Sequence, residues 1–204
     1  SYVFGPHPLI DENSEIAGTL AQNFFRGIKK DERLLCLISG GGSSMMALPK
    51  PPLSIHDKKN IITQVMLQGI PEREVNEIRK QLSEVKAGRL LELLPEIRVD
   101  NFFLSDEREH KLQAISSGPT VTGHEGAALK VAKQYNILDL LGSEARHLID
   151  KNTNQGQVSA QVVNHICGTR NDVMEALHHV LDHSGIFKSI SVETIPIHSV
   201  GPEK

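Results

Sequence analysis

The sequence predicts an α/β fold in which helices cover both faces of a mostly parallel sheet. Two observations lead to this prediction. Short apolar runs of strand length recur along the chain, and longer segments with a helical period of apolar residues separate them. Strands that alternate with helices are typical of βαβ units. The expected architecture is therefore a Rossmann-like three-layer sandwich.

Four segments are expected to be strands. The first, residues 34–38, is continuously apolar, so we expect it to be buried on both faces of the sheet. Two further apolar runs, residues 101–104 and 162–167, are also followed by small polar residues that end a strand. The last segment, residues 189–195, alternates between polar and apolar side chains, which places it toward a sheet edge.

Helices are expected between these runs. Four apolar residues from Ile16 to Ile28 recur every four positions, and residues typical of an N-cap precede them. The same kind of period predicts further helices over residues 61–69, 75–94 and 173–185.

Length and composition limit the class of protein. The chain has 204 residues, of which 39% are hydrophobic and 23% charged, so we expect residues 1–204 to form a single α/β domain. The net charge of −3 argues against a nucleic-acid binder, and no apolar run approaches the roughly 20 residues of a membrane span. Two cysteines cannot form a secreted disulfide framework. We expect a cytoplasmic protein, without excluding mitochondria, that binds neither nucleic acid nor membrane.

The first candidate site directly follows the first predicted strand. In open parallel sheets, ligands bind beyond the carboxyl ends of the strands. Glycines there let the backbone approach a ligand closely, and backbone N–H groups together with serine hydroxyls hold phosphate. The loop lacks both the Walker lysine and the dinucleotide-binding spacing, so a tight turn without a ligand is an equal alternative. The candidate phosphate-binding residues are Ser39, Gly40, Gly41, Gly42, Ser43 and Ser44.

A second candidate site follows the next predicted strand. Asp106 closes that strand, where a carboxylate can hold Mg²⁺. The small-residue turn that contains Ser117 and Gly118 could present its backbone to the same crevice. For Asp106 alone, helix capping or a surface turn is the simpler interpretation.

Basic residues lie between these two sites. The spacing of Arg79, Lys86 and Arg89 places them on one side of a continuous helix, where they would attract an anion. Glutamates are interleaved with them, so spacing alone favours a solvent-exposed helix with salt bridges.

Four motifs occur in order along the chain, at residues 7–14 (HPLIDENS), 37–43 (LISGGGS), 76–90 (NEIRKQLSEVKAGRL) and 104–120 (LSD followed by ISSGPT). Together they resemble the motifs of the class II glycerate kinases, in which an N-terminal α/β domain is followed by a C-terminal MOFRL domain. We expect this chain to correspond to an incomplete N-terminal domain without the MOFRL domain. The resemblance implies ATP-dependent phosphorylation of D-glycerate to 2-phosphoglycerate with Mg²⁺. The resemblance implies that the glycine loop, Ser117 and Gly118 bind phosphate and that Asp106 binds Mg²⁺. It also implies that Arg79, Lys86 and Arg89 are catalytic residues that contact the substrate or the phosphate.

The chain also departs from the family pattern. Glu109-His110 stands where the family has Gly-Asp, Gln81 replaces a histidine, and Ala87 replaces a glycine. The first hypothesis is a glycerate-kinase-like enzyme with D-glycerate and a nucleotide as partners, and we also consider a homodimer. The second is a catalytically inactive relative that keeps the fold and binds. The third, an unrelated nucleotide-binding α/β protein, is disfavoured by four motifs in order.

Overall fold

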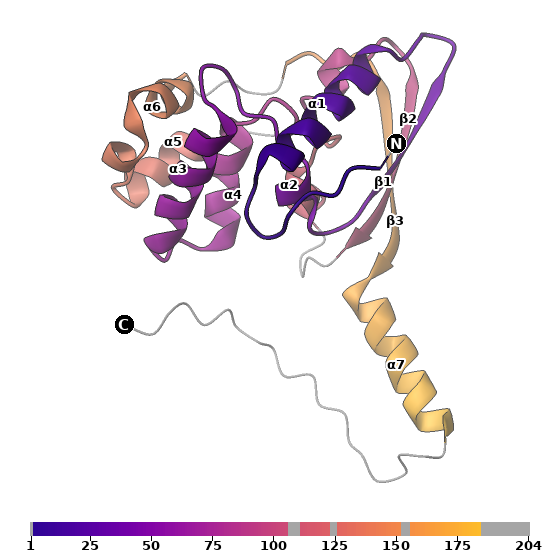
Figure 1. Ribbon diagram of the computed structural model, residues 1–204. Coiled ribbons are helices and arrows are strands. Elements are labelled where there is room, and N and C mark those ends of the chain that lie inside the picture. The colour runs from indigo at the N-terminus through magenta and orange to yellow at the C-terminus, as the bar shows by residue number, and fades with distance from the viewer. Residues whose placement is uncertain (1, 106–110, 123–125, 152–155, 185–204) are drawn as a thin grey trace.

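The computed structural model of the chain describes residues 2–105, 111–122, 126–151 and 156–184 (Figure 1). Three parallel strands form one sheet in the order β1-β2-β3, which confirms the α/β class. The predicted strand at residues 189–195 lies outside the described residues. The strands are β1 (Arg33–Ile38), β2 (Arg98–Ser105) and β3 (Gln161–Thr169).

Helices precede, connect and follow the strands. Those expected near residues 16–28, 61–69 and 173–185 are present, whereas the helices between residues 128 and 150 were not predicted. No helix in the described ranges is long and apolar enough to cross a membrane. The helices are α1 (Glu12–Arg26), α2 (Gly42–Met45), α3 (Ile55–Leu67), α4 (Glu72–Gln81), α5 (Ala128–Gln134), α6 (Gly142–Asp150) and α7 (Arg170–Ser184), with short 3₁₀ helices η1 (Leu91–Leu93), η2 (Ile115–Ser117) and η3 (Leu138–Leu140).

Helix α1 starts where the sequence predicts, at a capping box. The Asp11 carboxylate accepts hydrogen bonds from the backbone N–H groups of Asn13 and Ser14, and the Ser14 hydroxyl accepts one from the Asp11 N–H. The predicted apolar stripe at Ile16, Leu20 and Phe24, however, is exposed.

The buried face of α1 is instead made of small residues and Phe25. A Cβ built on Gly18 would lie 2.5 Å from the Ala47 carbonyl oxygen, so this face packs too closely for large side chains. Phe25 joins Leu34 and Val99 in the apolar cluster beneath the sheet. Close backbone approach, which apolar periodicity does not report, therefore decides which face of α1 is buried.

The helix predicted over residues 75–94 is wrong beyond Gln81, where α4 ends. Apolar periodicity continues because Leu82, Val85 and Leu90 are all buried, but the backbone between them is irregular. Ala87 and Gly88 adopt φ values of 54° and 75°, which a right-handed helix cannot contain.

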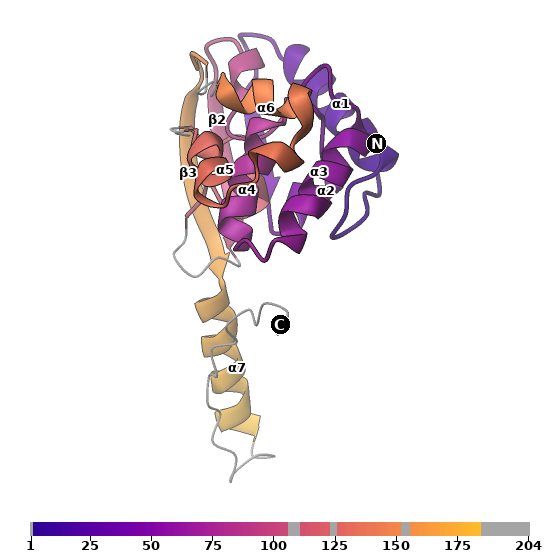
Figure 2. The same ribbon diagram turned by 90° about the vertical axis from the view of Figure 1, so that its left-hand side faces the viewer.

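The helices form two groups relative to the sheet (Figure 1). Helix α1, η1 and the strands enclose one apolar cluster, whereas α3 to α6 pack around a second cluster farther from the sheet. Figure 2 shows α7 leaving the carboxyl end of β3, away from both groups. The junction between the two helix groups lies beside the carboxyl ends of β1 and β2 and positions the candidate site.

One face of the sheet is open among the described residues. Leu35 and Leu37 of β1 are 61% and 85% exposed, whereas Leu34 is buried. The expected burial of residues 34–38 on both faces is thus not found in the described part of the chain. The connections β1–β2 and β2–β3 advance in the same direction across the sheet, and right-handed crossovers of that kind put their helices on one face.

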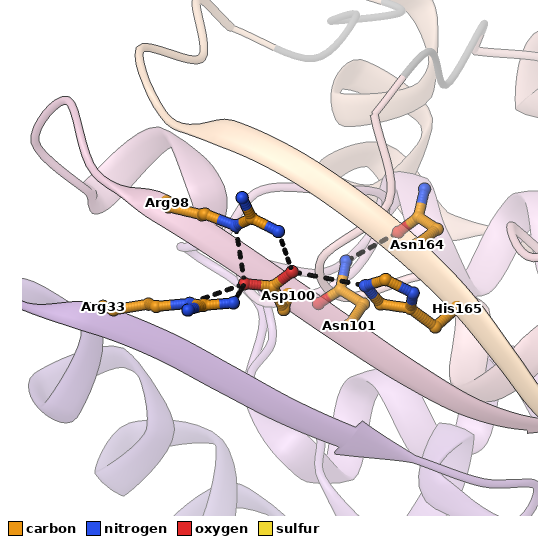
Figure 3. Close-up of polar contacts among 6 residues, drawn as sticks. All are labelled: Arg33, Arg98, Asp100, Asn101, Asn164 and His165. Atoms are coloured by element: carbon orange, nitrogen blue, oxygen red, sulfur yellow. Dashed lines mark hydrogen bonds and ion pairs between the residues drawn. The ribbon is translucent and has the colours of Figure 1, made fainter.

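On this open face, a buried carboxylate links the three strands (Figure 3). Asp100 of β2, whose side chain is 1% exposed, accepts hydrogen bonds from Arg33 Nε (2.8 Å) and from Arg98 Nε and Nη2 (both 3.0 Å). The His165 Nε2 of β3 lies 3.2 Å from Asp100 Oδ1. The Arg98 hydrogen bonds, with help from Arg33 and His165, hold the pKa of Asp100 well below its ordinary value despite burial.

We expect the Phe25→Ala variant to lose about 3–5 kcal/mol of unfolding free energy, because it leaves a cavity in the core. The neighbouring Phe24→Ala variant should lose about 1 kcal/mol or less, mainly through the edge-to-face contact between the two rings. Urea denaturation measures both values. Equal losses would show that α1 buries the stripe of Phe24 after all.

The Asp100→Asn variant should be less stable than the wild type at pH 7. A lowered folded-state pKa contributes stability above the unfolded value of 3.8, and this contribution is lost as the pH falls toward the folded-state value. The stability difference between variant and wild type should therefore shrink below pH 3.8. Urea midpoints measured across pH 2–7 test this, with exposed Asp139→Asn as the control that should stay close to wild type throughout. A difference that does not depend on pH would contradict it.

Candidate functional site

The carboxyl ends of β1 and β2 lie side by side. The two strands are parallel, and Ile38 pairs with Phe103, so both chains leave the sheet at the same edge. Ser39 and Gly40 line a cavity of about 590 Å³ together with Ser105. The glycine loop and the end of β2 therefore meet, as the sequence predicts. Asp106 itself lies outside the described residues, so its role as a Mg²⁺ ligand stays a prediction.

The glycine loop (residues 39–44) packs against the turn that contains Ser116, Ser117 and Gly118, called the second turn below. The two segments are so close that some positions of the glycine loop have no room for a side chain. Gly41 has a φ of 84°, and α2 begins at Gly42. A Cβ on Gly42 would lie 2.4 Å from the Ser116 Oγ and 3.0 Å from its Cβ. Glycine at position 42 thus allows the two loops to pack against each other.

Serine hydroxyls join the two loops directly. Ser116 Oγ donates a hydrogen bond to the Ser39 carbonyl oxygen at 2.5 Å, and the hydroxyls of Ser43 and Ser117 lie 2.8 Å apart. Both Ser116 and Ser117 have positive φ values, of 53° and 61°. The turn therefore holds strained backbone in order to present these serines to the glycine loop.

The ammonium group of Lys86 bridges the same two loops. Lys86 Nζ donates to the carbonyl oxygens of Gly42 (2.7 Å) and Ser116 (3.0 Å). Its side chain is buried, and this burial lowers the pKa of Lys86 to about 7. Lys86 thus connects both predicted phosphate-binding segments.

Backbone and side-chain bonds fix the second turn in place. The N–H groups of Ala87 and Gly88 donate to the carbonyl oxygens of Ser117 (3.0 Å) and Gly118 (2.7 Å), respectively. On the helix-covered face of β2, Asn101 exchanges hydrogen bonds with Thr120. Asn101 also bonds to Asn164 of β3, as Figure 3 shows. The turn is therefore fixed to the sheet on one side and to the segment after α4 on the other.

A second cavity, of about 320 Å³, lies between these loops and helices α3 and α4. Its wall combines apolar residues of α3 and α4 with hydroxyl and cationic groups. Glu72 is the one carboxylate among its described lining residues. The cavity therefore fits an anion better than a metal ion. Its hydroxyl groups belong to Ser43, Ser44 and Ser117, and its cationic groups include the buried Lys58 and Lys86 and the half-buried Arg79.

The three predicted cations, Arg79, Lys86 and Arg89, do not share one face of a helix. Arg79, at the end of α4, lines the cavity and donates to Asn76 Oδ1 at 2.9 Å and to Glu72 Oε1 at 3.4 Å. Lys86 belongs to the irregular segment after α4. The structure therefore corrects the expected single helical face of Arg79, Lys86 and Arg89, but it brings the first two together.

Arg89 occupies a buried position and is not among the residues that line this cavity. Its Nη1 donates to the backbone carbonyl oxygens of Lys80 (2.7 Å) and Lys86 (3.1 Å). In the described residues, Arg89 thus holds the backbone that carries Lys86.

Sequence reasoning missed Lys58, which is 3% exposed and lines the cavity. A signal was present in the sequence. Lys58 lies in the same helical period as the buried residues Ile55, Ile62 and Val65, so it occupies a core-facing position of α3. A lysine at such a position is an unusual residue that calls for a partner.

The described residues contain no group of three or more His, Cys, Asp or Glu side chains suited to hold a metal ion. Glu109 and His110, which stand where the family has Gly-Asp, lie outside the described ranges.

Comparison with known proteins connects this geometry to one family. The family described as "Domain of unknown function (DUF4147)" matches residues 1–150. The glycerate kinase of Danio rerio is 28% identical over 178 residues, which cover 86% of this chain and 34% of that protein. The glycerate 2-kinase of Picrophilus torridus is 35% identical over 115 residues, or 56% of this chain and 28% of that protein. The chain thus spans about a third of the length of these relatives.

Solved structures agree with the sequence comparison. The crystal structure of a glycerate kinase from Thermotoga maritima superposes with a TM-score of 0.73 at 28% identity, covering 89% of this chain and 43% of that one. A protein from Pyrococcus horikoshii OT3 gives a TM-score of 0.75 at 26% identity over the same shares.

The close contact between the loops generates a prediction about stability. The Gly42→Ala variant should lose about 1–3 kcal/mol, because its new methyl group overlaps Ser116. The loss should be smaller in a Ser116→Gly background, with a coupling of about 0.5 kcal/mol or more in a double-mutant cycle. Gly27→Ala is the matched control, since its Cβ would meet nothing closer than 3.5 Å. Additive effects of the two substitutions in urea denaturation would refute the contact.

Proposed function

The chain belongs to the DUF4147 family, and we propose that it provides the phosphate-binding part of a glycerate-kinase-like phosphotransferase. The proposed reaction transfers a phosphoryl group from ATP to the 2-hydroxyl of D-glycerate and yields 2-phosphoglycerate. We further propose that residues 1–204 make up one α/β domain of this enzyme.

The observation that supports this function best is the junction of the two loops around Lys86. Phosphoryl transfer depends mainly on positioning of the reactants and on neutralising the charge of the moving group. The glycine loop and the Ser117 turn lie together at the carboxyl ends of parallel strands, the usual ligand position in such sheets. Beside them lies a cavity with buried cations.

Each part of the site then has a proposed task. The backbone and hydroxyls of residues 39–44, with Ser117 and Gly118, contact phosphate. Lys86 and Arg79 face the anionic groups of the reactants in the cavity. Arg89 acts as a positioning residue through its hydrogen bond to the Lys86 carbonyl oxygen.

The cavity also matches the proposed acceptor. D-Glycerate has one carboxylate and two hydroxyl groups, and the cavity offers cationic and hydroxyl groups within about 320 Å³. Mg²⁺, when bound, would neutralise phosphate charge, and Asp106 is the proposed ligand. The chemistry that depends on the described residues is binding, orientation and charge neutralisation.

The test is turnover by the Lys86→Met variant. Purified chain is incubated with ATP, Mg²⁺ and D-glycerate, and ADP and 2-phosphoglycerate are followed. We expect product from the wild type and a loss of about 100-fold or more in Lys86→Met, because a preorganised charged donor is removed. Lys133→Met, which removes an exposed charge on α5, is the control and should retain activity. Urea denaturation verifies that each variant is folded.

The outcomes separate the two candidate functions. Binding of ATP or D-glycerate by calorimetry without any product would identify the inactive relative that keeps the fold. Absence of both binding and turnover, or unchanged turnover in Lys86→Met, would overturn the proposed function.

A further inference from the structure

Lys58 is a buried lysine whose ammonium group has no described acceptor. It lies in the second turn of α3, is 3% exposed and lines the 320 Å³ cavity. Among the described residues, no carboxylate forms an ion pair with it and no carbonyl oxygen accepts its hydrogen bond. Lys86, by contrast, satisfies its ammonium group with two backbone carbonyl oxygens.

The charges around Lys58 further raise the free energy of its buried ammonium group. The described groups whose charge acts on it are all cations, namely Lys86, Arg89, Arg79 and Lys50. Lys59 and His7 also line the cavity, and Glu72, the carboxylate of the lining, already bonds to Arg79. A buried cation among cations is stable only when an anion completes the cluster.

We propose that Lys58 binds an oxyanion of the small molecule that occupies this cavity, a carboxylate or a phosphoryl group. This assignment rests on the proposed function, because it gives Lys58 a task in the same site. The hydroxyls of Ser43, Ser44 and Ser117 lie around the same space and would donate to the remaining oxygens. Lys58 is then a binding residue of the enzyme in addition to the cations that the sequence suggested.

A purely structural role explains Lys58 less well. A structural lysine at a core-facing position donates to backbone carbonyl oxygens or pairs with a carboxylate, as Lys86 and Lys80 do. Methionine would fill the same volume of α3 without a desolvated charge. A lysine at position 58 is therefore a disadvantage to the fold that a bound anion would offset.

Anion binding by Lys58 has a consequence that can be measured. Burial and the neighbouring cations lower the pKa of Lys58 well below its ordinary value. A bound anion favours the charged ammonium and raises that pKa again. Binding therefore takes up protons from solution, and part of this uptake belongs to Lys58.

Isothermal titration calorimetry of the full chain tests the proposal. Inorganic phosphate and D-glycerate are titrated separately, each in two buffers of different ionisation enthalpy, so that the difference in heat reports proton uptake. For Lys58→Met we expect at least about tenfold weaker binding of the anion and a smaller proton uptake than in the wild type. Lys133→Met, which carries the same change of charge on the surface of α5, should match the wild type in both respects.

Thermal unfolding provides a second measurement that does not depend on catalysis. Lys58→Met should be at least as stable as the wild type without ligand, because it removes a buried charge from a cationic cluster. Phosphate or D-glycerate should raise the Tm of the wild type and leave that of Lys58→Met nearly unchanged. The anion that produces the shift shows whether a phosphoryl or a carboxylate group occupies the position.

The outcomes distinguish this proposal from the proposed function. Equal anion binding by wild type and Lys58→Met, or no binding of either anion by the wild type, would overturn the role of Lys58. Weaker binding with unchanged proton uptake would show that Lys58 is already charged before the anion arrives, and it would leave the contact between Lys58 and the anion intact. Anion binding through Lys58 without ADP release would leave this proposal intact and remove the kinase function.

Discussion

The site depends on the burial of one ammonium group between two loops. Lys86 can donate to Gly42 and Ser116 because the left-handed backbone at Ala87 and Gly88 turns the chain back toward the second loop. The same turn places two N–H groups on the carbonyl oxygens of Ser117 and Gly118. The glycine loop, the serine turn and the cavity are therefore parts of one hydrogen-bonded unit at the end of the sheet.

Apolar periodicity and capping predict those elements whose conformation is decided locally. The strand at residues 34–38 and helices α1, α3 and α7 have these signals, and each is present. Periodicity does not distinguish a helix from irregular backbone that also buries every third or fourth residue, so it predicts a helix over residues 75–94 although α4 ends at Gln81. It also misses a helix face that packs through Gly18, where the absence of a side chain allows the contact.

The candidate site was more predictable than the packing around it. Residues 39–44 and the end of β2 stand at chain positions that parallel strands bring to one edge, so topology alone places them together. Ser117 reaches the same edge because hydrogen bonds from the segment after α4 and from Asn101 hold its turn there. Lys58 lies on α3, which is not part of that edge of the sheet and comes near the site only through its packing against α4. Its contribution depends on tertiary packing, and the only sequence signal is a charge within an apolar period. Asp106, the other predicted group, lies outside the described residues.

The distribution of charge links the site to the stability of the fold. A protein with a net charge of −3 gathers Lys50, Lys58, Arg79, Lys86 and Arg89 around one region, and burial lowers the pKa of each of them. Mutual repulsion and desolvation make this cluster unfavourable in the folded state, whereas the unfolded chain leaves every cation in water. An anion that binds only the folded chain must therefore stabilise it. A cationic cluster retained at such a cost is best explained by the ligand whose charge it neutralises.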